Sequence, residues 1–334
     1  MVNPVLILEL LERIAAVPAG STVTVPLGSA DQEEATPTVA AWCHRTGNEL
    51  VGVRDGAVTV RRGRAPAPRT AVEDGRLPGT RLWMYTNFDC NLACDYCCAR
   101  SSPQTARRAL GLDRIRRLAA EAVASGVSEL ILTGGEPFLL PDLDGLVAVC
   151  TTALPTTLLT NGMLFRGHRL ERLRRMDRSR LTLQISLDSA TPDGHDSHRG
   201  KGSWQRAVAG IRIAQDEGFR VKVAATLPAA QSHELEPFHE FLDALGIDPV
   251  DQVIRALAHR GNADAGIELT IESLIPEVTV TAEGVYWHPI GADDTDQLIT
   301  AEIFPLAAAI AEVRRRFTDQ RARADAASQW FPCA

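Results

Sequence analysis

Four of the seven cysteines fall within nine residues, at Cys90, Cys94, Cys97 and Cys98. Three thiolates with the spacing of Cys90, Cys94 and Cys97 can wrap a 4Fe-4S cluster while leaving one iron without a protein ligand. An open metal position is what a catalytic site requires, because a small molecule must occupy it. The spacing therefore predicts a 4Fe-4S cluster on these three cysteines.

The same cysteines also fit a structural stripe or a zinc site. Positions i, i+4 and i+7 share one face of a helix, so the three could form a buried helical stripe. A zinc site would need a fourth ligand, and no histidine is near in the sequence; the usual zinc signature also pairs two Cys-x2-Cys motifs. The neighbouring Cys98 would assist by hydrogen transfer or substrate attachment, or it would simply pack.

Further motifs carry groups that suit a small polar ligand. The paired glycines at residues 134–135 allow close backbone approach to a ligand, and the carboxylate of Glu136 suits an ammonium group. The hydroxyl of Ser186 and the carboxylate of Asp188 suit ribose hydroxyls. The guanidinium fork of Arg199 fits a carboxylate. Taken alone, each motif also fits an ordinary turn, a helix cap or a solvated loop arginine.

The elements around these motifs alternate between apolar strands and amphipathic helices. Strands are predicted at residues 82–87, 129–133, 157–160, 181–187, 221–226 and 253–257. The helices between them complete the pattern of a parallel sheet with helical crossovers, an α/β fold. Six such units fit a partial (β/α)6 TIM-type barrel better than a complete barrel, and the motifs fall at the carboxyl ends of its strands.

Three segments flank this barrel, which we place at residues 81–260. Residues 1–62 predict a small N-terminal α/β two-layer domain with a helix from Pro4, a strand at 21–26, a helix near 38–45, and strands at 50–53 and 57–60 that turn at Asp55-Gly56. Residues 63–80 predict a linker, because prolines, glycines and charges fill them. Residues 261–334 predict a C-terminal hairpin-plus-helix extension, with strands at 278–281 and 285–288 and a helix at 303–323.

The barrel segment resembles the radical SAM superfamily, in particular its MoaA-like and peptide-modifying branches. The three-cysteine spacing with an aromatic residue before the third cysteine is similar to the family signature, and the later motifs follow in the family's order. The resemblance implies that S-adenosylmethionine (SAM) occupies the open iron. The metal ligands that it implies are Cys90, Cys94 and Cys97. The SAM-binding residues that it implies are Tyr96, Gly134, Gly135, Glu136, Asn161, Ser186, Asp188 and Arg199.

The flanking segments resemble two further families. Residues 1–62 resemble a TusA-like sulfur-carrier domain, but the position of that family's active cysteine falls on Met1, so a docking or structural module is implied, with Cys43 as a small core residue. Residues 278–289 resemble the hairpin of SPASM extensions, which bind auxiliary clusters through several cysteines. Because Cys333 is the only cysteine of this region, we expect no auxiliary cluster. The aromatic run ending at His288 either lines the substrate pocket or forms a buried edge.

Composition and charge limit the partners. A net charge of −7 offers no concentrated basic face to nucleic acid or to an anionic membrane. The N-terminus has neither a basic start nor a small-residue cleavage site, and no apolar run approaches the length of a membrane span. We therefore expect a cytoplasmic protein that binds neither nucleic acid nor membrane.

The radical SAM resemblance implies an activity as well as a fold. It implies reductive cleavage of SAM to a 5'-deoxyadenosyl radical that modifies a peptide or small-metabolite substrate, and an electron donor such as flavodoxin or ferredoxin. The N-terminal segment adds a sulfur-handling partner to the hypothesis. Two alternative functions stay open, a non-catalytic iron-sulfur electron-transfer protein and a sulfur-trafficking adaptor. The motif at residues 186–188 argues against a carrier, which has no use for a nucleoside site, and the missing active cysteine argues against an adaptor.

Overall fold

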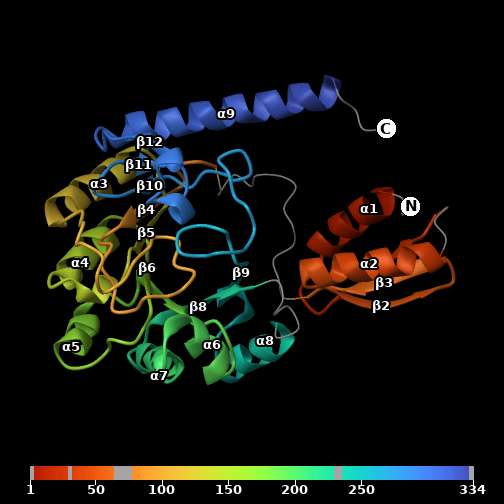
Figure 1. The fold of residues 1–334 in the computed structure, drawn as a ribbon, viewed down its shortest axis with the longest axis horizontal. Coiled ribbons are helices and arrows are strands. Elements are labelled where there is room, and N and C mark those ends of the chain that lie inside the picture. The colour runs from red at the N-terminus through yellow and green to blue at the C-terminus, as the bar shows by residue number, and fades with distance from the viewer. Residues whose placement is uncertain (1–3, 29–31, 64–76, 229–234, 331–334) are drawn as a thin grey trace. The chain divides into compact units, whose positions relative to one another are not determined.

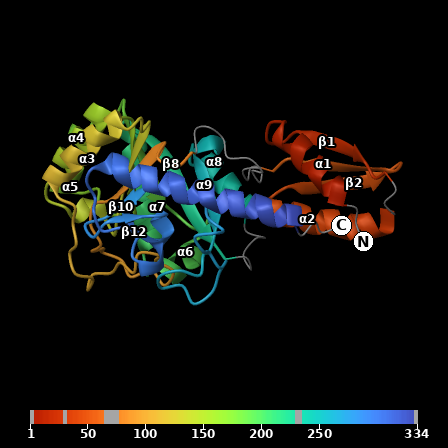
Figure 2. The same ribbon diagram turned by 90° about the horizontal axis from the view of Figure 1, so that it is seen from above.

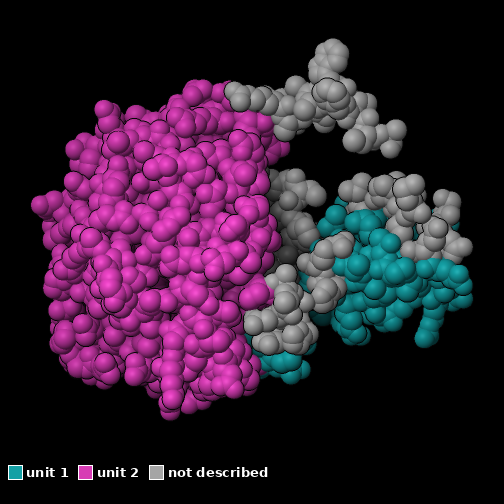
Figure 3. Space-filling view, in the orientation of Figure 1, with its two compact units in different colours: residues 1–72, 230–240 teal, residues 73–229, 241–334 magenta. Residues whose placement is uncertain are grey.

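The computed structural model describes residues 4–28, 32–63, 77–228 and 235–330 (Figure 1). Two compact units make up the chain, one of residues 1–72 with 230–240 and one of residues 73–229 with 241–334 (Figure 3). The predicted linker lies mostly outside the described residues, as do Met1 and Cys333.

The first unit is a three-stranded antiparallel sheet with two helices. Its elements are α1 (Pro4–Ala15), β1 (Thr22–Pro26), α2 (Gln32–Thr46), β2 (Glu49–Arg54) and β3 (Ala57–Arg61), and the strand order is β1-β3-β2. The predicted hairpin is confirmed, because β2 pairs with β3 across a turn in which Asp55 and Gly56 both have positive φ. Helix α2 begins earlier than predicted, because Pro37 lies inside the helix and not before its start.

The core of the first unit joins the helices to the inner face of the sheet. Leu6, Leu10 and Ile14 lie on one face of α1 and are buried, and Ile7 and Leu11 are partly buried against them. They belong to one apolar cluster with alternate residues of β1 and β3 and with Trp42 and Cys43 of α2. The expectation that Cys43 is a core residue is confirmed, since only 2% of it is exposed.

The second unit is built on a nine-stranded sheet of the order β12-β11-β10-β4-β5-β6-β7-β8-β9, as far as the structure describes it. Six of its strands run parallel in chain order: β4 (Arg81–Tyr85), β5 (Glu129–Thr133), β6 (Thr156–Thr160), β7 (Leu181–Ser186), β8 (Arg220–Leu227) and β9 (Gln252–Ala256). These are the six predicted strands, shifted at their ends by two residues at most. The predicted partial (β/α)6 barrel is confirmed.

Helices connect and cover these strands. They are α3 (Leu112–Ala124), α4 (Leu143–Ala153), α5 (His168–Arg175), α6 (Pro192–Arg199), α7 (Ser203–Asp216), α8 (Leu235–Ala244) and α9 (Leu306–Trp330). Figures 1 and 2 show α3, α4, α5 and α7 on the outer side of the sheet, with α9 beside α3. None of the described helices is long and apolar enough to cross a bilayer.

The C-terminal hairpin continues the barrel sheet. Strand β10 (Thr279–Val280) pairs in parallel with β4, and β11 (Val285–Tyr286) and β12 (Leu298–Thr300) follow it in antiparallel order. The predicted hairpin is confirmed, although both of its strands are shorter than expected. The segment that follows β11 lines the same pocket as the carboxyl ends of the barrel strands, so this extension contributes to the wall described below.

Helix α7 rests directly on the turn after β6. A Cβ atom added at Gly210 would lie 2.1 Å from the carbonyl oxygen of Gly162. We predict that Gly210→Ala lowers the free energy of unfolding by about 1–3 kcal/mol, because an extra methyl group forces these two backbones apart. The measurement is urea denaturation followed by circular dichroism.

The matched control is Gly145→Ala in α4, where an added Cβ has nothing within 4 Å. It should raise stability by about 0.5–1 kcal/mol, because alanine is the better helix former. Equal stability of the two variants would mean that α7 does not contact the turn at Gly162.

Candidate functional site

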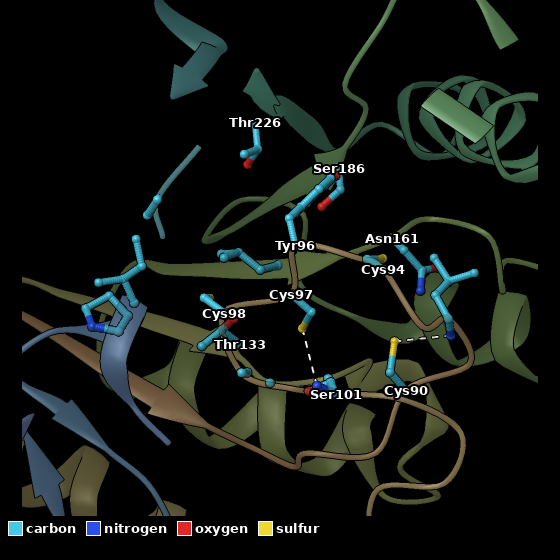
Figure 4. Close-up of a pocket in the computed structure, with 18 of the residues that line it drawn as sticks. Cys90, Cys94, Tyr96, Cys97, Cys98, Ser101, Thr133, Asn161, Ser186 and Thr226 are labelled. Carbon is cyan, nitrogen blue, oxygen red and sulfur yellow. Dashed lines mark hydrogen bonds between the residues drawn. The ribbon is translucent and has the colours of Figure 1, made fainter. Parts of the chain in front are cut away.

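A pocket of about 270 Å³ lies at the carboxyl ends of the parallel strands (Figure 4). Its wall is formed by the loop after β4, by the ends of β5 to β9 and by the segment that follows β11. The predicted site residues that line it are Cys90, Cys94, Tyr96, Cys97, Gly134, Gly135, Asn161, Ser186 and Arg199. Glu136 and Asp188 are not among the lining residues and lie behind the wall.

The loop after β4 presents the three cysteines to this pocket. The backbone N–H of Leu92 donates to Sγ of Cys90 at 3.4 Å, and that of Ser101 donates to Sγ of Cys97 at 3.3 Å. Burial raises the pKa of the Cys90 thiol to about 12 and that of the Cys94 thiol to about 11. Both thiols are therefore protonated at neutral pH, and a bound metal would displace these protons.

The end of β5 holds one side of the cysteine loop. The N–H of Gly135 donates to the carbonyl of Asn87, and that of Glu136 donates to the carbonyl of Asp89, both at 3.0 Å. A Cβ atom at Gly135 would lie 2.2 Å from the Asp89 oxygen, and one at Gly134 would lie 2.4 Å from the Asn87 oxygen. The cysteine loop therefore requires both glycines, which also line the pocket in which we expect a ligand.

A segment after β9 holds the other side of the loop. Asn262 donates its backbone N–H to the carbonyl of Cys97 at 3.0 Å and its side-chain Nδ2 to the carbonyl of Cys94 at 3.4 Å. Gly261 has a φ of 66°, and a Cβ there would lie 2.2 Å from the Cys97 carbonyl oxygen. Sequence reasoning misses both residues. The only signal for them is that they form a Gly-Asn pair shortly after the last barrel strand.

Glu136 is fully buried behind the pocket wall. Its carboxylate accepts hydrogen bonds from the N–H of Phe138 at 2.9 Å, the hydroxyl of Thr160 at 2.8 Å and the N–H of Asn161 at 2.8 Å. Burial raises the pKa of this carboxyl, while the three donors oppose the shift. The carboxylate thus joins the ends of β5 and β6 and is not among the groups that line the pocket.

Asp188 has a similar place behind β7. It accepts hydrogen bonds from the hydroxyl of Tyr96, from Nε and Nη2 of Arg199 and from the N–H of Thr226. Burial acts to raise the pKa of Asp188, but the Arg199 guanidinium, Tyr96 and His195 together bring it below its ordinary value. Asp188 is therefore an ionised group that ties the cysteine loop to β8 and α6.

His195 of α6 completes this network. Its Nδ1 accepts the N–H of Asp188 at 3.1 Å, which assigns the ring proton to Nε2. Burial lowers the pKa of His195 to about 4, so the ring is neutral at physiological pH.

Residues 84–245 match the sequence model of the Radical SAM superfamily. This segment belongs to that superfamily. Subtilosin biosynthesis protein AlbA of Bacillus subtilis is 32% identical to the chain over 159 residues, which cover 47% of this chain and 35% of AlbA. The AdoMet-dependent heme synthase of Methanosarcina barkeri is 31% identical over 159 residues, which cover 47% of this chain and 45% of the synthase.

A solved structure shows the same fold. Streptococcus suis SuiB, crystallised with S-adenosylmethionine, aligns with a TM-score of 0.50 and 20% identity, over 59% of this chain and 45% of SuiB. The chain thus spans less than half the length of each of these three proteins. The radical SAM family uses a 4Fe-4S cluster and SAM.

The pocket of this chain fits such a cluster. Cysteine thiolates are the ligands that hold iron-sulfur clusters, and Cys90, Cys94 and Cys97 all line the pocket, together with Cys98. The buried hydroxyl of Ser101 lines the pocket too and makes no hydrogen bond within the described residues; a cluster sulfur would supply the acceptor that it lacks. No three His, Cys, Asp or Glu side chains of the described segments converge as they would around a single ion.

Asn161 was also predicted to lie at this site, and the aromatic run that ends at His288 was predicted either to line it or to form a buried edge. Asn161 donates from Nδ2 to Asn91 at 2.8 Å, which connects the end of β6 to the cysteine loop. Of the aromatic run after β10, His288 lines the pocket, whereas Tyr286 and Trp287 are buried elsewhere. Lining residues that sequence reasoning did not single out include Tyr85, Ser101, Thr226 and Arg255.

The buried pair of Asp188 and Arg199 gives a stability prediction. Asp188→Asn should lower the free energy of unfolding by about 3–5 kcal/mol, because it leaves the Arg199 guanidinium buried without a counter-charge. Chemical denaturation of the metal-free chain measures the change. The control is Asp319→Asn, which removes an i,i+4 pair with Arg315 on the surface of α9 and should cost about 0.3–0.5 kcal/mol. Equal costs for the two variants would contradict the buried pair.

The neutral ring of His195 gives a pH prediction. Its pKa is about 4 in the folded chain and 6.5 as the ordinary value, so on acidification the unfolded chain takes up this proton first. The free energy of unfolding should therefore fall as the pH drops from 6.5 towards 4, by up to about 1.4 kcal/mol per pH unit from this group.

The test compares the pH dependence of stability in wild type and in His195→Gln. The variant should lose this slope while keeping an acceptor for the Asp188 N–H. His259→Gln, at a half-exposed histidine, is the control and should keep the slope. A slope unchanged in His195→Gln would show that His195 has the same pKa in the folded and the unfolded chain.

Proposed function

We propose that this protein is a radical SAM enzyme that holds a 4Fe-4S cluster on Cys90, Cys94 and Cys97 and reductively cleaves SAM. The observation that carries the proposal is the pocket at the strand ends, in which all three cysteines share one wall with the glycine, asparagine, serine and arginine of the later motifs. When bound, the cluster and SAM supply a 5'-deoxyadenosyl radical that removes a hydrogen atom from substrate.

The residues of this chain bind, orient and shield. The backbone at residues 134–135, the end of β6 at Asn161 and the hydroxyl of Ser186 are offered to SAM. Arg199 uses Nε and Nη2 on Asp188, which leaves Nη1 as its donor for the SAM carboxylate. Glu136 and Asp188 act through the wall residues that they position, since neither lines the pocket.

The substrate in this proposal is a peptide or a small metabolite. The names of the relatives favour both classes, since AlbA serves the biosynthesis of a bacteriocin and the heme synthase serves that of a tetrapyrrole. The pocket itself supports either class, because the ends of β8 and β9 and the segment after β11 contribute to its wall away from the SAM motifs. The reductant in this proposal is a flavodoxin or a ferredoxin.

The N-terminal unit is proposed to be a docking module for a sulfur-handling partner. Burial raises the pKa of the Cys43 thiol to about 12, so this cysteine is no substitute for the persulfide carrier of a TusA-like domain. In a docking role, the partner would carry the sulfur and this unit would need only a stably folded surface. The buried core of the unit stabilises such a fold.

The decisive prediction concerns Cys94. After anaerobic reconstitution and reduction with dithionite, the wild type should form 5'-deoxyadenosine from SAM, and Cys94→Ala should form none above background, because the cluster loses a ligand. The measurement is chromatography of the nucleoside product beside an iron assay. The matched control is Cys150→Ala, a buried cysteine of α4 outside the pocket, which should keep both iron and product.

Two outcomes would count against the proposal. Product formed by Cys94→Ala would refute the cluster assignment. A wild type that carries its full iron and forms no product would favour a non-catalytic electron carrier.

A further inference from the structure

The pocket wall carries guanidinium groups but no carboxylate. Its lining includes two arginines, Arg199 and Arg255, and no aspartate or glutamate. Arg199 is compensated from behind the wall by Asp188. Arg255 makes no hydrogen bond or ion pair within the described residues, although most arginines of the barrel do.

Arg255 faces the pocket from the last barrel strand. On β9 it is the register partner of Thr226 on β8, and both residues line the pocket. The motifs assigned to SAM end β5, β6 and β7 or lie on α6. Arg255 is therefore on a different strand from the residues offered to the cofactor.

His288 adds a second donor to the same part of the wall. Its Nδ1 accepts the N–H of Ile290 at 3.2 Å. Burial, followed by the charges of Arg255 and Arg81, lowers the pKa of His288 to about 4, so the ring is neutral and its proton is on Nε2. No acceptor for this Nε2–H occurs among the described residues.

Two elements from opposite ends of the sheet thus bring together two donors without an acceptor. Strand β9 is one edge of the nine-stranded sheet, and His288 follows β11 near the other edge. The hydroxyl of Tyr85, which also lines the pocket, is already committed, since it donates to the carbonyl of Pro289 at 2.7 Å. A guanidinium and an imidazole N–H that share a cavity wall without an acid suit an anion.

We propose that Arg255 and His288 bind an anionic group of the substrate, a carboxylate or a phosphate. This inference rests on the proposed function. That function assigns the SAM carboxylate to Arg199 and leaves Arg255 for a second molecule, the substrate. It narrows the substrate class to peptides with an acidic side chain or a free C-terminus, and to metabolites that carry a carboxylate or a phosphate.

Residue-resolved labelling of arginines with phenylglyoxal tests the inference without knowledge of the substrate. The full chain is labelled anaerobically, both metal-free and after reconstitution with cluster and SAM, and each arginine is followed by peptide mass spectrometry. The probes are N-acetylglutamate α-amide, its uncharged match N-acetylglutamine α-amide, and inorganic phosphate at equal ionic strength. The control is Arg206, which is exposed on α7, outside the pocket and without a hydrogen bond among the described residues.

At about ten times its dissociation constant, the glutamate probe or phosphate should slow the labelling of Arg255 by about tenfold, because only the unoccupied arginine reacts, and leave Arg206 unchanged. Protection by the glutamate probe alone assigns a carboxylate, and protection by phosphate alone assigns a phosphate. Protection by the uncharged match to the same extent would overturn the inference, as would equal protection of Arg206 or no protection by either anion.

SAM has its own arm in this test. Protection of Arg255 by SAM alone would overturn the inference, because the arginine would then serve the cofactor. Failure of the proposed function has a different signature: the chain would take up no cluster and cleave no SAM, while anion protection of Arg255 in the metal-free chain would still be present.

Discussion

The whole site depends on the close backbone contact between the loop after β4 and the end of β5. Two hydrogen bonds, from Gly135 to Asn87 and from Glu136 to Asp89, fix the start of the cysteine loop to the neighbouring strand. Only glycine permits this contact, because any Cβ would overlap the facing carbonyl oxygens. Asn262 fixes the other end of the loop through the carbonyls of Cys94 and Cys97. The cysteines are thereby held in place before any metal arrives.

Two buried carboxylates extend this rigidity to the rest of the pocket. Glu136 joins the ends of β5 and β6, and Asp188 joins β7 and β8 to the cysteine loop through Tyr96. Each is expensive to bury unless its oxygens are fully hydrogen-bonded, and both are. Such groups position wall residues without presenting charge to the cavity. Of the two arginines that line the pocket, Arg255 has no carboxylate partner among the described residues. It lies on the last barrel strand, and the segment after this strand also contacts the cysteine loop.

The sequence predicted the six barrel strands and the C-terminal hairpin because buried parallel strands and a Glu-Gly turn leave strong local patterns. It also brought the three cysteines, Asn161, Ser186 and Arg199 to one pocket, since the carboxyl ends of parallel strands share an edge. The sequence did not place Glu136 behind the wall. A signal was present, because Pro137 begins a 3-10 turn and a proline at this position is typical directly after an N-cap residue, which here is Glu136. The position of Arg255 in the pocket and the contacts of Gly261 and Asn262 with the cysteine loop depend on which loops meet across the barrel. Local sequence patterns do not encode these contacts. The TusA-like identity of the N-terminal unit stays a prediction.

The central claim is a cluster on three cysteines with one iron open to SAM, and electron paramagnetic resonance of the reduced, reconstituted protein tests it most directly. The account predicts the signal of a reduced 4Fe-4S cluster whose g-values shift when SAM is added, because SAM binds the iron that has no protein ligand. Protein that binds zinc in place of iron, or a cluster signal that SAM leaves unchanged, would contradict it.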